Sequence, residues 1–177
     1  IGRKKVFIWG VVILTIFSIL SGLATTGVTL IIYRFLAGIG SAMMFGTSTA
    51  ILTSSIPAEK RGKAMGVVAA TVYSSLAAGP FVGGLLTQYF NWHSIFFVSA
   101  AICFIVAVGG YYIIKEDWKE EVKSKFDTIG SILFAIGLFA LIYGFAELPH
   151  IQGFIFIVIG IIVLFLFALY EKKQEFP

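Results

Sequence analysis

Between Ala64 and Ile114 lie 51 consecutive residues without a single Asp, Glu, Lys or Arg. A helix crosses the hydrocarbon core of a bilayer with about 20 apolar residues, so this stretch is long enough for two crossings. Over the whole chain, 59% of the residues are hydrophobic and 12% are charged. Soluble domains carry about 25% charged residues. The chain is therefore predicted to be embedded in a membrane, and a soluble globular domain is excluded.

The same pattern predicts six membrane-spanning helices. Their expected ranges are Val6–Ala24, Val28–Ile56, Ala64–Tyr89, Ser94–Ile114, Ile129–Ala146 and Phe154–Tyr170. Only helices and closed β-barrels satisfy their backbone hydrogen bonds in lipid. Strands of a barrel would alternate polar and apolar residues, and these segments do not alternate. We therefore expect an all-α fold, a polytopic bundle of transmembrane helices.

Basic residues indicate the orientation, because Lys and Arg are retained on the cytoplasmic side of a membrane. With six crossings, 12 of the 13 basic residues fall on one side: Arg3, Lys4, Lys5, Lys60, Arg61, Lys63, Lys115, Lys119, Lys123, Lys125, Lys172 and Lys173. The turns on the other side contain none. Both ends of the chain are therefore predicted to be cytoplasmic, in a multi-pass protein of the cell membrane. This sidedness accounts for the net charge of +4 without a nucleic-acid partner.

Arg34 is the only basic residue inside a predicted span, about two helical turns from its outer end. A charge at that depth is costly in lipid. One interpretation is that its long side chain extends to the headgroups. The other starts from Gly38, Ser41 and Ala42, a small-residue face at helical spacing. This face would pack against protein and turn Arg34 towards a cavity or a carboxylate.

The third predicted helix combines a flat face with a proline. Ser75, Gly79 and Gly83 recur every four residues, with Gly84 beside them, so a second helix could approach closely. Pro80 removes a backbone hydrogen bond and is expected to bend the helix. Small-residue spacing alone is also typical of ordinary helix packing. Together with a bend, it favours a hinge or a seal in a moving bundle.

Residues 115–126 form the largest polar interruption of the chain. Trp118, Val122 and Phe126 recur every four residues and continue from Ile114, which is typical of an amphipathic helix on the inner membrane surface. A solvated linker is the alternative. Either structure separates residues 1–114, with four predicted helices, from residues 127–177, with two.

Residues for catalysis are not grouped in the sequence. His93 and His150 lie in different outer turns, and Cys103 has no second cysteine with which to pair. Interfacial histidines are the simpler interpretation, since no His or carboxylate pair has the spacing of metal ligands. Glu147 is either a proton-exchanging group or, as its place at a helix end favours, a solvated carboxylate. We expect no enzyme activity, no metal and no cofactor.

These residues resemble motifs of the major facilitator superfamily, and most closely of its drug:proton antiporters with fourteen helices. The segment from Ser75 to Leu86 is similar to the antiporter motif of the fifth helix. Its core is matched by Gly79, Pro80, Gly83 and Gly84, with Ser75 in place of the first glycine. The fourth-helix motif, whose arginine is implicated in proton transfer, is matched by Leu30, Arg34, Gly38, Gly40, Ser41 and Ala42. Ala37 departs from the glutamine often found there.

The resemblance extends to the loops and the last helices. One match is to the cytoplasmic gating loop between helices two and three. The second half of that loop is similar to Gly2, Arg3, Lys4 and Lys5 of this chain. The loop between helices four and five is resembled by Pro57, Arg61, Gly62, Lys63 and Gly66. The helix that follows the central loop is resembled by Asp127, Gly130, Leu133 and Gly144.

The resemblance implies a place for each part of the chain. Residues 1–114 would be helices three to six of the N-terminal bundle, and residues 115–126 a cytoplasmic amphipathic linker. Residues 127–177 would be the two helices that link the bundles. The chain begins with Ile1 on a basic run, so we expect further helices of the same carrier to precede it. This part would not transport by itself.

The implied function is proton-coupled multidrug efflux by alternating access, with substrate bound between two halves of the carrier. The implied partners are the lipid bilayer, an amphipathic or cationic substrate, protons and the remaining helices. Two alternatives stay open. Another carrier of the superfamily could move a solute together with protons, and it would normally lack the Gly-Pro pair. A membrane-embedded enzyme or assembly subunit would need a polar cluster within one leaflet, which these spans lack.

Overall fold

The structure, a computed structural model, describes residues 2–114 and 127–172. These residues form six helices and no strand: α1 (Arg3–Gly22), α2 (Gly27–Ser55), α3 (Ala58–Tyr89), α4 (His93–Ile113), α5 (Thr128–Ala146) and α6 (Ile151–Glu171). All six are long and apolar enough to cross a membrane. The predicted all-α bundle of six membrane-spanning helices is confirmed. The amphipathic linker predicted at residues 115–126 lies outside the described residues.

Two helices begin among charged residues that the hydropathy pattern leaves outside the predicted spans. Helix α1 begins at Arg3 rather than Val6, and α3 begins at Ala58 rather than Ala64. Lys, Arg and Glu are good helix formers, so a helix can continue through them after it leaves the hydrocarbon. The prediction that residues 2–5 form a loop is therefore wrong for Arg3 to Lys5, which make the first turn of α1, with Gly2 preceding it as the N-cap.

The chain divides into two compact units, Ile1–Glu120 with α1 to α4 and Glu121–Pro177 with α5 and α6. The assignment of these units to particular bundles of a larger carrier stays a prediction.

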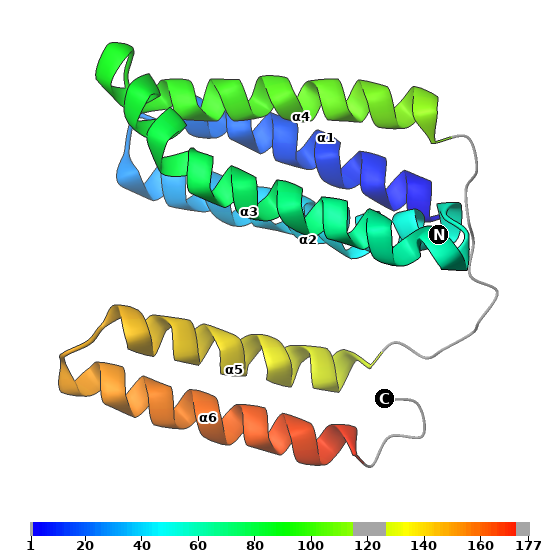
Figure 1. Ribbon diagram of the computed structural model, residues 1–177. Coiled ribbons are helices and arrows are strands. Elements are labelled where there is room, and N and C mark those ends of the chain that lie inside the picture. The colour runs from blue at the N-terminus through cyan, green and yellow to red at the C-terminus, as the bar shows by residue number, and fades with distance from the viewer. Residues whose placement is uncertain (1, 115–126, 173–177) are drawn as a thin grey trace. The chain divides into compact units, whose positions relative to one another are not determined.

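In the first unit, α1 is the central helix and packs along α2 on one side and α4 on the other (Figure 1). A Cβ atom added at Gly10 would lie 2.8 Å from the carbonyl oxygen of Gly40, and one added at Gly40 would lie 2.6 Å from that of Gly10. The two backbones are therefore in direct contact. Between α1 and α4, aromatic side chains rather than backbone atoms make the contact. Phe97 of α4 lies against Gly22 of α1, and Phe7 of α1 lies against Gly110 of α4.

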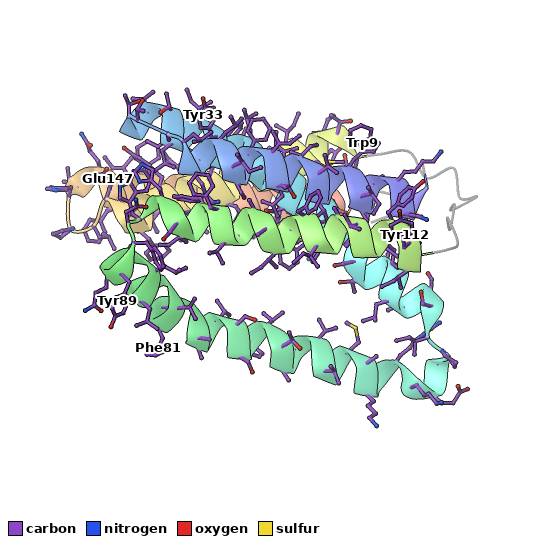
Figure 2. All side chains as sticks on the ribbon, turned by 90° about the horizontal axis from the view of Figure 1, so that it is seen from above. Trp9, Tyr33, Phe81, Tyr89, Tyr112 and Glu147 are labelled. Atoms are coloured by element: carbon purple, nitrogen blue, oxygen red, sulfur yellow. The ribbon has the colours of Figure 1, made fainter. Side chains whose placement is uncertain are left out.

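Helix α3 differs from its neighbours because none of its residues is buried. It contacts α2 near its first residues and α4 near its last residues. At the α4 contact, Ser94 Oγ donates to the carbonyl of Leu86 at 3.3 Å. The helix continues through Pro80. Figure 2 shows its ribbon changing direction near Phe81, as expected where a proline removes a backbone hydrogen bond.

The second unit is a hairpin of α5 and α6 closed by glycines seven residues apart. These are Gly130, Gly137 and Gly144 on α5 and Gly153 and Gly160 on α6. Seven residues make about two turns, so each set lies along one side of its helix. Cβ atoms added at Gly144 and Gly153 would each lie within 2.8 Å of the other glycine's carbonyl oxygen. This spacing of seven is visible in the sequence, but only the structure shows that the two sets of glycines face each other.

The backbone contact between α1 and α2 predicts opposite effects for two glycines of one helix. Gly40→Ala should destabilise the protein by about 1–3 kcal/mol, because its methyl group meets the backbone of α1. Gly46→Ala should be neutral or stabilise by up to about 1 kcal/mol, because no atom lies within 4 Å of its added Cβ and alanine favours helix. Thermal unfolding of the detergent-solubilised protein measures both changes. Equal shifts for the two variants would contradict this description of the contact.

Candidate functional site

Arg34 lies about two turns into α2, at the end of the first unit where the turns 23–26 and 90–92 also lie. Its side chain is exposed within this unit. The guanidinium carbon lies 5.6 Å from the centroid of the Phe96 ring, which belongs to the first turn of α4. Among the residues that the structure describes, Arg34 is therefore paired with an aromatic ring rather than with a carboxylate.

The small-residue face beside Arg34 is open in this unit. Gly38 and Ala42 are exposed and Ser41 is half-exposed. An added Cβ at Gly38 would meet no atom within 4 Å. The side of α2 that packs on α1 instead contains Ala37 and Gly40, both buried. The described helices do not cover the face of Gly38, so its packing partner stays a prediction.

None of the antiporter-like residues of α3 is buried within the unit. Ser75, Gly79, Pro80 and Gly84 are exposed, and Gly83 is half-buried. Cβ atoms added at Gly79 and Gly84 would meet nothing within 4 Å, and at Gly83 only a methyl group of Ile95 at 4.0 Å. The hydroxyl of Ser75 donates to the carbonyl of Thr71 at 2.8 Å, so this polar group is satisfied within its own helix. The flat face is present, and within the described unit another helix reaches it only at Gly83, through Ile95 of α4.

The basic residues that begin α1 reach the ends of two neighbouring helices. Arg3 Nη1 donates to Ser54 Oγ at 2.8 Å and to the carbonyl of Ala50 at 3.4 Å, in the last turns of α2. Lys4 Nζ donates to the carbonyl of Tyr111, near the end of α4, at 3.0 Å. The same nitrogen lies 5.3 Å from the centroid of the Tyr111 ring. Cations are favourable at helix C-termini, where free carbonyls carry partial negative charge.

These contacts place the beginning of α1 at the same end of the unit as the ends of α2 and α4 (Figure 1). The acceptors Ser54 and Tyr111 were not identified from the sequence. Nothing in their spacing marks them, since they lie far from Arg3 and Lys4 in the chain and meet them only through the antiparallel arrangement of the helices.

The two histidines lie where helices start: His93 is the first residue of α4 rather than part of the turn before it, and His150 is the N-cap of α6. His93 stacks on Trp92 with ring centroids 3.7 Å apart. His150 and Glu147 line a shallow hollow of about 400 Å³ at the turn between α5 and α6, and Figure 2 labels Glu147 there. Within residues 2–114 and 127–172, none of His93, Glu147 and His150 lies in a group of three metal-ligating side chains. The role of Glu147 stays a prediction.

Asp127 has a local structural role at the start of α5. Its carboxylate accepts a hydrogen bond from the backbone N–H of Gly130 at 3.0 Å, as the N-cap of that helix. The hydroxyl of Tyr170, near the end of α6, also donates to it at 3.4 Å. These contacts join the two ends of the hairpin.

Curated relatives cover most of this chain. The tetracenomycin C resistance and export protein of Streptomyces glaucescens is 29% identical over 148 residues, which are 84% of this chain and 28% of that protein. The riboflavin transporter RibZ of Clostridioides difficile (strain 630) is 29% identical over 175 residues, 99% of this chain and 38% of that protein. The puromycin resistance protein pur8 of Streptomyces alboniger is 31% identical over 182 residues, which cover 99% of this chain and 36% of that protein.

The chain thus spans between 28% and 38% of the length of these relatives. The family model described as Major Facilitator Superfamily matches residues 1–170. That match includes all four helices of the first unit and almost all of the α5–α6 hairpin. With six apolar helices of membrane-spanning length across the same residues, the chain belongs to the major facilitator superfamily, a family of membrane transporters.

Proposed function

We propose that the intact protein is a secondary transporter of the cell membrane that exports amphipathic or cationic compounds in exchange for protons. The observation that carries this proposal is the exposed small-residue face of α3 around Gly79 and Pro80, which resembles the motif of antiporters within the superfamily. Two relatives whose names describe resistance, to tetracenomycin C and to puromycin, support the same direction of transport.

In this proposal, α1 to α4 are helices three to six of a fourteen-helix carrier, and α5 and α6 are the helices that link its two bundles. The basic ends of the helices are cytoplasmic. Substrate binds between the bundles, which rock to expose it to either side. The face of α3 then packs against another helix of the carrier and slides along it, sealing the outer side.

Arg34 is proposed to couple protons to the substrate. A guanidinium within a few ångströms of a carboxylate favours its ionised form and so lowers its pKa. If the carrier brings an acid close to Arg34 in one conformation only, that acid releases its proton in that conformation. The absence of a carboxylate beside Arg34 among the described residues leaves its charge available for this role.

A second candidate function is that of another solute carrier, and the riboflavin transporter that matches 99% of this chain makes riboflavin the solute to test. In that case the carrier moves a solute together with protons instead of exchanging them. The direction of proton movement separates the two functions. Everted membrane vesicles with an acidic interior should lose protons when an exported amphipathic cation such as ethidium is added, and should not respond to riboflavin.

Replacing Arg34 tests the coupling role. Full-length Arg34→Ala should lower ethidium-driven proton release from everted vesicles about tenfold or more, because the group that stabilises the ionised acid is lost. Arg34→Lys keeps the charge and should retain part of the rate. Proton release is followed with a pH-sensitive dye at equal protein levels. Normal coupling in the alanine variant would remove Arg34 from the mechanism.

Replacing Gly79 tests the face of α3. Gly79→Leu should slow turnover or raise the passive proton leak, because a large side chain holds two helices apart where close approach is needed. Ala77→Leu adds similar bulk two residues away, on nearly the opposite side of α3, and should leave both rates unchanged. Flux and leak are measured in the same vesicles. Two variants that behave alike would reduce the motif to a stretch of lipid-facing helix.

The proposed orientation is tested by labelling from outside intact cells. In a background from which Cys103 and every other cysteine of the carrier have been removed, Asn91→Cys should react with a membrane-impermeant maleimide, because it lies in the outer turn. Lys60→Cys should react only after the cells are opened. Reaction of both positions from the same side would contradict the proposed topology.

A further inference from the structure

The contact between Arg34 and Phe96 is the first step of a continuous row of aromatic rings on α4. The ring of Phe96 meets that of Trp92 edge to face, with centroids 6.0 Å apart and planes at 90°. Trp92 then stacks on His93 at 3.7 Å. We call Phe96, Trp92 and His93 the aromatic row. It begins beside the guanidinium of Arg34 on α2 and ends at the start of α4, where Trp92 is the N-cap and His93 the first residue.

The far end of the aromatic row opens on a hollow of about 870 Å³. Its walls come from the two turns at this end of the first unit, from the last residue of α1 and from the first two turns of α4. Trp92 and His93 belong to these walls, whereas Phe96 and Arg34 do not. The ring of Phe96 thus contacts both the guanidinium of Arg34 and the indole of Trp92, which lines the hollow.

An aromatic ring holds a guanidinium in a different way from a carboxylate. The negative face of the ring attracts the cation within about 6 Å of its centroid. The ring neutralises no charge and occupies none of the five N–H donors of the guanidinium in an ion pair. A carboxylate would do both. A ring thus fixes the position of Arg34 while leaving its charge and its donors free for another group.

We propose that Phe96 is a positioning residue for Arg34, which holds the guanidinium beside α4 so that it meets the proton-carrying acid in one conformation of the carrier. This inference rests on the proposed function, since it assigns a partner to the coupling arginine. Without the ring, Arg34 is free to extend to the headgroups. Its charge would then be present in the protein but misplaced for coupling.

Variants of Phe96 distinguish an attraction to the cation from mere filling of space. In everted vesicles of the full-length carrier, Phe96→Leu should lower the maximal rate of ethidium-driven proton release by about threefold or more. The ethidium concentration at half-maximal rate should change less than twofold. Phe96→Trp, which restores an aromatic face, should recover the rate. Phe97→Leu makes the same change at the next residue, which packs on Gly22, and should leave the maximal rate unchanged.

A double-mutant cycle measures the contact without transport. Thermal unfolding of the purified carrier is compared for Phe96→Leu, Arg34→Gln and the two together. The two shifts in unfolding temperature should be non-additive, because each substitution removes the same interaction. The cycle with Phe97→Leu should be additive. Additive shifts at Phe96, or a Phe96→Leu carrier as active as the parent, would overturn the positioning role.

The failure of this inference is distinct from the failure of the proposed function. A parent carrier that releases no protons on addition of ethidium overturns the proposed exchange, and the role of Phe96 in it, whatever the cycle shows. A parent that couples, and loses coupling in Arg34→Ala but not in Phe96→Leu, overturns the positioning role alone.

Discussion

Close approach of helix backbones is the interaction on which this structure depends. In lipid, burying an apolar side chain against another helix gains little, because the lipid tails are equally apolar. Stability must come from dense contact, and glycine permits it by removing the side chain from the contact. Gly10 and Gly40 bring α1 against α2, and Gly144 and Gly153 bring α5 against α6. Both units are organised around such contacts.

Contact between helices also separates the residues that hold each unit together from the residues with proposed functional roles. Buried Ala37 and Gly40 lie on the packed side of α2, whereas Arg34 and Gly38 lie on an open side. Gly79 and Pro80 likewise lie on α3, which has no buried residue. Packing within the unit thus leaves the proposed functional faces exposed. In the proposed carrier, these faces meet substrate or moving helices.

Much of the fold was predictable because hydropathy reports directly on the free energy of placing residues in lipid. Six helices, and their order, followed from it. The first residues of α1 and α3 did not, because a helix continues beyond the hydrocarbon wherever its residues favour helix. Arg34 and the Gly79–Pro80 stretch could be singled out because a charge and a proline are costly inside a span. Their neighbours could not, since a phenylalanine such as Phe96 is an ordinary residue in any apolar helix.

By itself, the sequence determined that this chain forms membrane-spanning helices, because only a regular helix satisfies the backbone over such long uncharged segments. Tertiary structure alone decided which side of each helix is packed. Glycines at positions 38 and 40 are indistinguishable by composition, yet one is open and the other touches backbone. Only tertiary structure brought Arg34 to Phe96 and Arg3 to Ser54. Such contacts join residues about fifty or more positions apart, and they depend on how helices cross, which hydropathy does not encode.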